Sequence, residues 1–295
     1  MHSTVIEEEL RALKSEEAWF LEQEVTAALD EIKVHIQLAL LALGESLQGQ
    51  EFESSAGSTL ALSSPSNESI KGFVSIFGSQ INKGELRIVL PRHLKAKTYD
   101  IKIDPDHPII LAQIQDTVNF LHMALELLAT ECLPASVIQA QEYIQDLLAC
   151  LRKAEAFFAL PLTNTIQYPM NIPDPTLPEN IVLELFINRT NFVAKVHVLE
   201  SGGNLQRSHS HPPFSGQLPI ATGTVPSPPA PRIIHQVSVD TVYPYLETAQ
   251  DAMAKAGHLT MDVSKKLRVF ATTDAELYEL HHVTRPAGPA LHHSV

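Results

Sequence analysis

The chain has 295 residues, 44% of them hydrophobic, so it can bury a sizeable core. It carries 21 Lys and Arg against 34 Asp and Glu, which gives a formal net charge of −13. Nucleic-acid binders and proteins held directly on anionic membranes need a basic surface, so this composition argues against both classes.

The sequence predicts a soluble protein of the cytosol. Two cysteines, Cys132 and Cys150, are too few for a disulfide framework, and we expect both to be buried thiols. The acidic run at 7–9 is unlike the basic region of a signal peptide, so none is expected. The most apolar helical stretch, Ile36 to Leu43, is too short to span a bilayer.

The first predicted element is a long helix. Thr4 and Glu7 have capping-box spacing, and Gly44 and Gly49 supply the stop. Apolar residues between them recur at steps of three and four, which is typical of one buried helix face. This face consists of Ala18, Leu21, Val25, Ala28, Leu29, Ile32, Ile36, Leu40 and Leu43. We interpret Trp19 as a core or interdomain anchor, and the glutamates at 7–9 and 16–17 as a solvated face.

A change to a period of two then predicts a group of strands. They lie at 71–77, 86–90 and 99–103. The Ser-rich segment 53–69 before them has little periodicity and is interpreted as a connection, with room for a short strand around Leu60. The polar segment 78–84 predicts a hairpin connection between the first two strands.

Two helices follow. Asp106 and Pro108 begin the first of them, and Pro134 begins the other. Their apolar stripes are Leu111, Ile114, Val118, Leu121, Leu125 and Leu128, and then Val137, Ile144, Leu148, Leu151, Ala154 and Phe158. The stripe from Leu111 to Leu128 is shorter than the three or more heptads of a coiled coil, which favours a bundle core over a dimerising zipper.

The last part begins with the clearest hairpin of the sequence. Strands at 181–187 and 192–199 flank the polar tetrad 188–191, and one more strand covers 233–239. A final helix carries Leu246, Ala249, Met253, Ala256, Val263, Leu267 and Phe270 on one face.

The segregated order of helices and strands predicts an α+β fold rather than alternating βαβ units. We expect a bundle of about four helices joined to an antiparallel sheet module of about six strands, with both strand groups in one sheet. The bundle would comprise 4–50, 106–160 and 240–271, and the sheet module 57–105 and 177–239. The Pro-rich insertion 201–231 is expected to be flexible, and the tail 272–295 disordered.

Few residues suggest chemistry. His209 and His211 offer imidazoles for a metal, but they lie in the Pro-rich insertion with no carboxylate or cysteine nearby. The His pairs 281–282 and 292–293 lie in the tail. Nucleotide-binding, zinc-protease and nucleophile-elbow motifs are absent. We therefore expect no catalytic residue, no metal and no cofactor, and the sequence leaves the partner-binding residues unknown.

In this order, the segments resemble the Rogdi family, labelled leucine-zipper proteins. The resemblance is carried by IKGFVSIFGSQINKGELRIVLPR from Ile70, ILAQIQDTVNFLHMALELL from Ile110, LPENIVLELFINRTNFVAKVHVL from Leu177, and HQVSVDTVYPYLETA from His235. A weaker match, EEAWFLEQEVTAAL, starts at Glu16. Order and spacing agree across about 7–270, whereas 201–231 and the tail have no counterpart.

The resemblance implies an elongated, non-catalytic adaptor. The family includes the small subunit of the fungal RAVE complex, which promotes reassembly of the cytosolic sector of the vacuolar proton-ATPase onto its membrane sector. The implied partners are a large WD-repeat scaffold subunit, an Skp-type adaptor and that cytosolic sector. The implied location is cytoplasmic, with peripheral recruitment to vacuolar and endosomal membranes through partners and without membrane insertion.

Two alternatives remain open at the level of sequence. One is a self-associating scaffold that uses the stripe 111–128 or 246–270 in an intermolecular coiled coil, which a strict monomer at micromolar concentration would exclude. The other is an unrecognised hydrolase with dispersed carboxylates and histidines, which requires a deep pocket of convergent polar groups.

Overall fold

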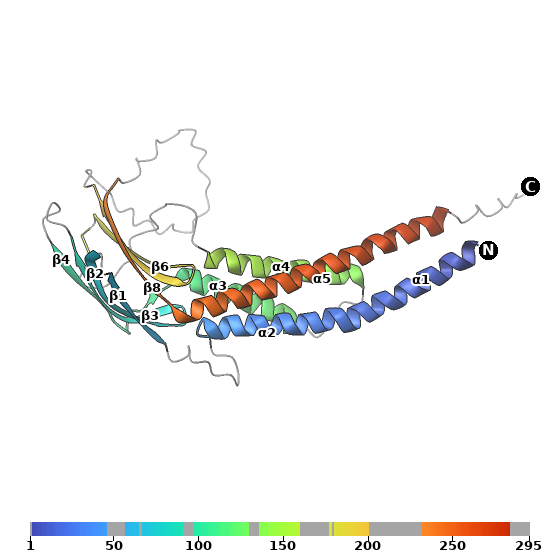
Figure 1. Ribbon diagram of the computed structural model, residues 1–295, viewed down its shortest axis with the longest axis horizontal. Coiled ribbons are helices and arrows are strands. Elements are labelled where there is room, and N and C mark those ends of the chain that lie inside the picture. Colours follow the sequence, from blue (N-terminus) through green and yellow to red (C-terminus); the bar gives the residue numbers. More distant parts are fainter. Residues whose placement is uncertain are drawn as a thin grey trace, which may run out of the picture.

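The computed structural model is elongated, with its helices at one end and its strands at the other (Figure 1). The structure describes residues 2–45, 57–64, 67–90, 97–129, 136–159, 177–178, 180–200 and 232–283, with side chains throughout except at 2–7, 64, 67 and 274–283. Helices and antiparallel strands are segregated in space, which confirms the predicted α+β class.

The first helix is continuous but changes geometry in its middle. Its parts are α1 (His2–Trp19), the π-helix η1 (Phe20–Val25) and α2 (Thr26–Ala42). Phe20 and Val25 are both buried although they are five residues apart, because the i→i+5 repeat of a π-helix keeps such residues on one face. The predicted stripe is wrong at Ala18, which is exposed, whereas the half-buried Leu21 packs against the core.

Gly44 ends this helix as predicted. Its φ of 87° allows the backbone N–H of Gly44 to bond Leu41 O and that of Glu45 to bond Leu40 O, each at 3.0 Å. This pair of bonds is a Schellman motif, in which a glycine takes the left-handed position that L side chains rarely adopt. The predicted second stop, Gly49, lies outside the described residues.

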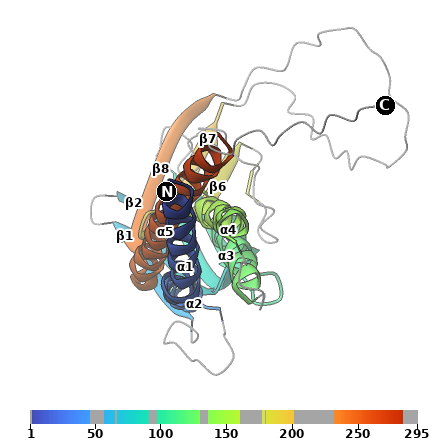
Figure 2. The ribbon, with the colours of Figure 1, turned by 90° about the vertical axis from the view of Figure 1, so that its right-hand side faces the viewer.

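Three more helices complete the bundle. They are α3 (Ala112–Ala129), α4 (Val137–Phe158) and α5 (Pro244–Val283). The helix α5 packs along both α2 and α4, and α3 packs mainly on α4 (Figure 2). The predicted end at Ala271 is wrong, because α5 continues to Val283, at the same end of the molecule as the start of α1 (Figure 1).

The predicted helix start at Asp106 and Pro108 is also wrong. Residues 105–106 form a turn, and Ile109–Ile110 form a short strand, β5, that pairs with Gln80 and Ile81. The two β-branched residues extend the sheet before α3 begins, and Ser79 O accepts the backbone N–H of Leu111 at 2.8 Å.

The larger sheet has five strands in the order β1-β2-β3-β4, with β5 paired to β3. The long strands are β1 (Ser58–Ser64), β2 (Asn67–Phe77), β3 (Gln80–Val89) and β4 (Thr98–Ile103). A tight turn at Gly78 and Ser79 joins β2 to β3, so the predicted connection at 78–84 is too long. Gly78 has a φ of 56°, the left-handed conformation that such hairpin turns need.

The smaller sheet has three antiparallel strands, β6 (Ile181–Asn188), β7 (Asn191–Leu199) and β8 (Ile233–Val242). A two-residue turn of Arg189 and Thr190 joins β6 to β7, and Arg189 has a φ of 55°. The expected single sheet is wrong, because β8 lies against β1 without pairing with it. Apolar residues of both sheets and of the helices form one continuous core. Each sheet therefore buries its apolar face although, among the described residues, no hydrogen bonds pair a strand of one sheet with a strand of the other.

Candidate interaction surfaces

A glutamine side chain joins α3 to the smaller sheet by two hydrogen bonds. Gln113, in the first turn of α3, accepts the backbone N–H of Ile187 at 2.8 Å and donates to Ile187 O at 3.1 Å. Since β6 is at the edge of the sheet that the described strands form, this side-chain amide takes the place of a neighbouring strand. Sequence reasoning missed Gln113, because a polar residue in an amphipathic helix carries no signal for a strand far away in sequence.

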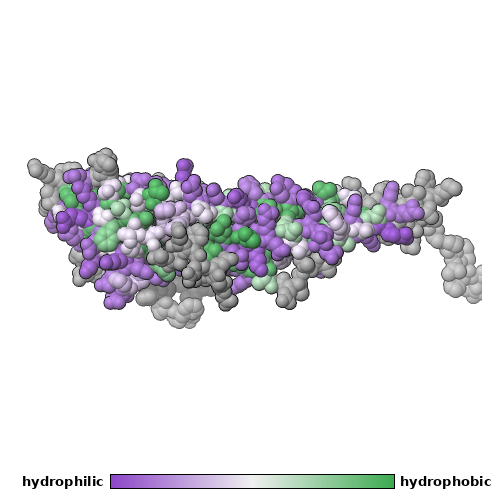
Figure 3. Space-filling model, turned by 60° about the horizontal axis from the view of Figure 1, so that its bottom comes forward, coloured by the Kyte–Doolittle hydropathy of each residue, from purple (hydrophilic) through white to green (hydrophobic). Residues whose placement is uncertain are grey.

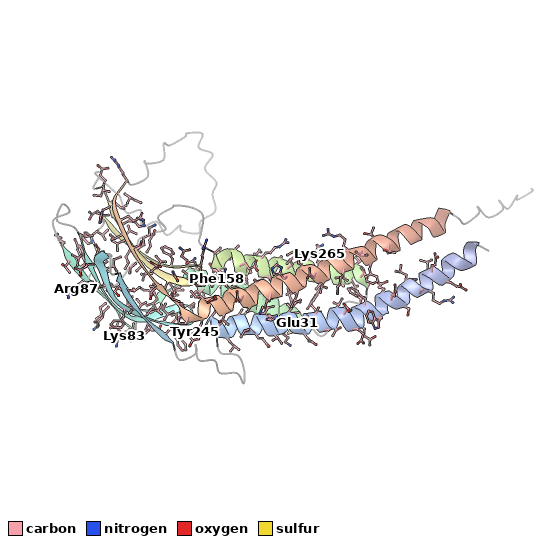
Figure 4. The ribbon with its side chains drawn as sticks, in the orientation of Figure 1. Glu31, Lys83, Arg87, Phe158, Tyr245 and Lys265 are labelled. Carbon is pink, nitrogen blue, oxygen red and sulfur yellow. The ribbon has the colours of Figure 1, made fainter. Side chains whose placement is uncertain are left out.

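A cleft of about 530 Å³ lies where the end of α4, the β6–β7 turn and α5 meet. Its lining includes Glu155, Phe158, Arg189 and Gln250. Figure 4 labels Phe158 at this junction between helices and strands. Partial burial raises the pKa of Glu155, while His258 and Arg152 lower it by a smaller amount. Glu155 is the single carboxylate among the described residues that line the cleft, whereas glycosidase-type hydrolysis needs a pair.

The outer face of the five-stranded sheet carries a charged row. Strand register places Lys71, Arg87 and Asp100 side by side on β2, β3 and β4. Arg87 Nε donates to Asp100 Oδ1 at 2.7 Å, which raises the pKa of the guanidinium. Both side chains are about two-thirds exposed, at 64% and 67%, so the pair contributes little to stability. In Figure 4, Arg87 and Lys83 lie on this outer side of the sheet.

This charged face also has apolar parts. Phe73 stands in the row next to Lys71, between Ala61 and Glu85, and Phe77 at the end of β2 is 45% exposed. A shallow groove of about 490 Å³ follows β2, β3 and β4. Aromatic side chains next to charged side chains are characteristic of surfaces that bind proteins.

A second apolar patch lies on the outer side of the α3–α4 hairpin. Phe120 and Phe157 stack with ring centroids 5.4 Å apart, and Lys153 Nζ lies 5.2 Å from the Phe120 centroid. Phe157 and Met123 are 42% and 48% exposed. The Lys153 cation over the aromatic face keeps this patch partly polar.

A histidine is buried in the smaller sheet. His197 on β7 is 3% exposed, and its Nε2 lies 2.9 Å from Glu184 Oε2 on the neighbouring strand β6. Its Nδ1 is buried and has no hydrogen-bond partner among the described residues. The pair lies on the face of β7 opposite to Phe192, Val196 and Val198, which belong to the central core.

The structure describes some of the Trp, Cys and His residues that the sequence singled out. Trp19 is 56% exposed, so its interpretation as a core anchor is wrong. Cys150 is buried as expected, and burial raises its thiol pKa. The candidates Cys132, His209, His211, His292 and His293 lie outside the described residues, and the side chains of His281 and His282 are likewise not described.

Neither a metal site nor a membrane-spanning helix is present among the described residues. Within them, no group of three or more His, Cys, Asp or Glu lies close enough together to hold a metal ion. No helix in the same part of the chain combines the length and apolarity needed to cross a membrane.

Comparison with known proteins identifies the family. The family model described as Rogdi leucine zipper containing protein matches residues 16–268, a range that includes strands β1 to β8, the helices α2, α3 and α4, and α5 as far as residue 268. No curated protein matches the chain. Because the match covers far more than half of the 295 residues, the chain belongs to the Rogdi leucine zipper family.

Proposed function

We propose that this protein is a non-catalytic adaptor, the small subunit of a RAVE complex. In this role it promotes reassembly of the cytosolic sector of the vacuolar proton-ATPase onto its membrane sector, and so vacuolar acidification. Family membership across 16–268 is the observation that carries the proposal.

The shape and surface chemistry of the molecule support an adaptor role. It is elongated, with the sheets at one end and the tips of α1 and α5 at the other (Figure 1), and its surface mixes hydrophilic and hydrophobic residues along its length (Figure 3). The sheet face at one end is charged and partly aromatic. Surfaces this far apart can hold two partners at once. A partner already held is at high effective concentration for its next contact, which offsets the entropy of bringing large pieces together.

The proposed partners are a large WD-repeat scaffold subunit, an Skp-type adaptor and the cytosolic ATPase sector. Recruitment through them would bring the protein to vacuolar and endosomal membranes from the cytoplasm, without a membrane-spanning segment of its own.

Affinity purification of the tagged full-length chain from its native cells, followed by mass spectrometry, tests this function. We expect a large WD-repeat subunit together with subunits of the cytosolic ATPase sector. Loss of the protein should also raise vacuolar pH. Recovery of the chain alone, with unchanged vacuolar pH, would overturn the proposal.

The self-associating scaffold is less well supported. Leu111, Ile114, Val118 and Leu121 are at most 2% exposed, and Leu125 and Leu128 pack on the same core, so this stripe is used within the chain. Most of the second stripe, from Leu246 to Leu267, is buried in the same way. A hydrolase would need more catalytic groups than the cleft at Glu155 brings together from the described residues.

A further inference from the structure

The tip of α1 extends past the four-helix part of the molecule. Val137, the first residue of α4, donates its backbone N–H to Glu17 Oε1 at 3.2 Å, which marks where α4 begins beside α1. The residues of α1 before Glu17 therefore run beyond α4, over a length of about 22 Å at 1.5 Å per residue. Figure 1 shows α1 and the end of α5 as the two helices that reach this end.

The base of this extension is fixed to α5. Phe20 stacks on Phe270 with ring centroids 4.7 Å apart, and Lys266 Nζ lies 2.7 Å from Glu24 Oε2. Both contacts involve the π-helix η1, and π-helices occur frequently at functional sites. The direction in which α1 leaves the bundle is thus set by packing at its base.

One face of α1 combines apolar and acidic residues, and none of them is buried by the described residues. Glu9, Ala12, Leu13, Glu16 and Trp19 recur at steps of three and four and form a single strip, which we call the α1 face. No side chain between 8 and 19 is buried, and Trp19 is 56% exposed. On α2, by contrast, the apolar face is buried, with Ile32 and Ile36 at 0%.

The charge of α1 selects the kind of partner. Residues 2–25 contain seven glutamates against one arginine and one lysine. Glu9 and Glu16 are exposed and stand between Leu13 and Trp19 around the helix. A second copy of α1 on this face would bring glutamates against glutamates, whereas a basic helix would pair with them.

We propose that the α1 face binds a basic amphipathic helix of a partner protein. Apolar residues of that helix cover Leu13 and Trp19, and its Lys or Arg side chains lie against Glu9 and Glu16. This is helix-on-helix recognition, in which an aromatic anchor, here Trp19 at the base of the face, supplies much of the affinity. The inference deepens the adaptor function proposed above and rests on it for the existence of a partner.

Trp19 is the one tryptophan of the chain, so its fluorescence reports directly on this face. The probe is a synthetic amphipathic helix made of Leu and Lys, and its matched control has Glu in place of every Lys. Titration of the full-length protein with the Lys peptide should shift Trp19 emission to shorter wavelength and protect it from acrylamide. An absence of both effects, or an equal response to the Glu peptide, would overturn the proposal.

Charge and apolar variants locate the binding. Trp19→Ala, and Glu9→Lys with Glu16→Lys, should each weaken binding of a labelled Lys peptide by about tenfold or more. The matched controls are Val34→Ala, an exposed apolar position on α2, and Glu142→Lys with Asp146→Lys on the exposed side of α4. Equal weakening by the controls would mean non-specific attraction to an acidic protein. Circular dichroism verifies that every variant is folded.

Two further measurements separate other outcomes. Sedimentation equilibrium of the protein alone tests whether a second copy of the chain occupies the α1 face. A dimer that the double variant Glu9→Lys with Glu16→Lys abolishes would show that the occupant is a second copy and not a partner helix, and would overturn the proposal. Purification from native cells then compares wild type with the Trp19→Ala variant. If wild type recovers the WD-repeat subunit and the variant recovers it equally, the α1-face proposal fails and the adaptor function stands. If wild type recovers no partner, the adaptor function itself fails.

Discussion

Gly72 lies in the middle of β2, where β2 and β3 approach each other closely. A Cβ at this position would lie 1.9 Å from the backbone oxygen of Glu85, and the φ of 150° disfavours L side chains. Backbone atoms cannot move aside as a side-chain tip can. We predict that Gly72→Ala lowers the free energy of unfolding by at least about 2 kcal/mol, measured by urea denaturation.

Gly257 in α5 is the matched control at the same residue scale. Outside its own helix, a Cβ there meets, among the described residues, only the Oε1 atom of the flexible Glu155 side chain, at 3.2 Å. Alanine is also favoured over glycine inside a helix. Gly257→Ala should therefore leave stability unchanged or raise it by up to about 1 kcal/mol. Equal losses in both variants would contradict the close-approach explanation for Gly72.

Tyr243, at the start of α5, gives a prediction for alkaline pH. Burial raises the pKa of Tyr243 to about 12 from its ordinary 10, with a smaller contribution from Tyr245. Since the folded state binds the phenolic proton more tightly, stability should be unaffected below pH 10 and fall as the pH rises from 10 to 12.

Tyr243→Phe should remove this part of the alkaline loss. Spectrophotometric titration of wild type should show one of its six tyrosines ionising last, and the variant should lack that step. Urea denaturation at pH 8 and above pH 11 should give a smaller difference for the variant than for wild type. An identical pH dependence in both proteins would contradict the assignment.

At the scale of elements, the bond between Gln113 and β6 fixes the sheet to the bundle. Gln113→Ala removes two hydrogen bonds and leaves the N–H and C=O of Ile187 unpaired at a partly buried edge. We expect a loss of about 1–3 kcal/mol in the free energy of unfolding. Faster hydrogen exchange at Ile187 should accompany it.

Gln145→Ala is the control for that variant. Gln145 is exposed on α4, and its replacement should change stability by less than about 0.5 kcal/mol. If hydrogen exchange at Ile187 were unchanged in Gln113→Ala, the side-chain amide would not be what protects this edge.

Sequence periodicity correctly predicted the helices and strands that bury one face against the core, because that burial produces a regular pattern of apolar residues. The hairpin at 181–199 and the stripe of α3 are clear because one face of each is buried against the core. The π-helix was not predictable, since its single extra residue per turn shifts the stripe only between Phe20 and Val25. The pairing of Ile109–Ile110 with β3 depends on a contact across the fold, which overrides local propensity.

The candidate surfaces were less predictable than the fold. A lone tryptophan in an amphipathic helix is expected in the core, but Trp19 is exposed because Glu17 and Phe20, on other sides of the helix, make the contacts with α4 and α5. Which side of the helix meets its neighbours depends on their positions, and the sequence of α1 does not contain them. The charged row on β2, β3 and β4 similarly depends on strand register.

At the scale of the whole molecule, one core runs through the helices and both sheets. Residues from α2, β2 and β7, among them Ile36, Val74 and Val196, belong to the same buried cluster. The division into a bundle and a sheet module remains a prediction about domains. Because the core is continuous, we expect the bundle and the sheet module to unfold together, since neither can unfold without exposing apolar surface of the other.

Gly72→Ala tests this cooperativity, since it perturbs the sheet alone. Far-UV circular dichroism follows mainly the helices, whereas hydrogen exchange can follow the amides of β2 and β3. If the core is one cooperative unit, the variant should lower the urea midpoint of the helical signal by as much as that of the strand amides. If the variant lowers the urea midpoint of the strand amides and leaves that of the helical signal unchanged, the helices and the sheet unfold independently. The contacts of the continuous core would then not couple the unfolding of the two parts.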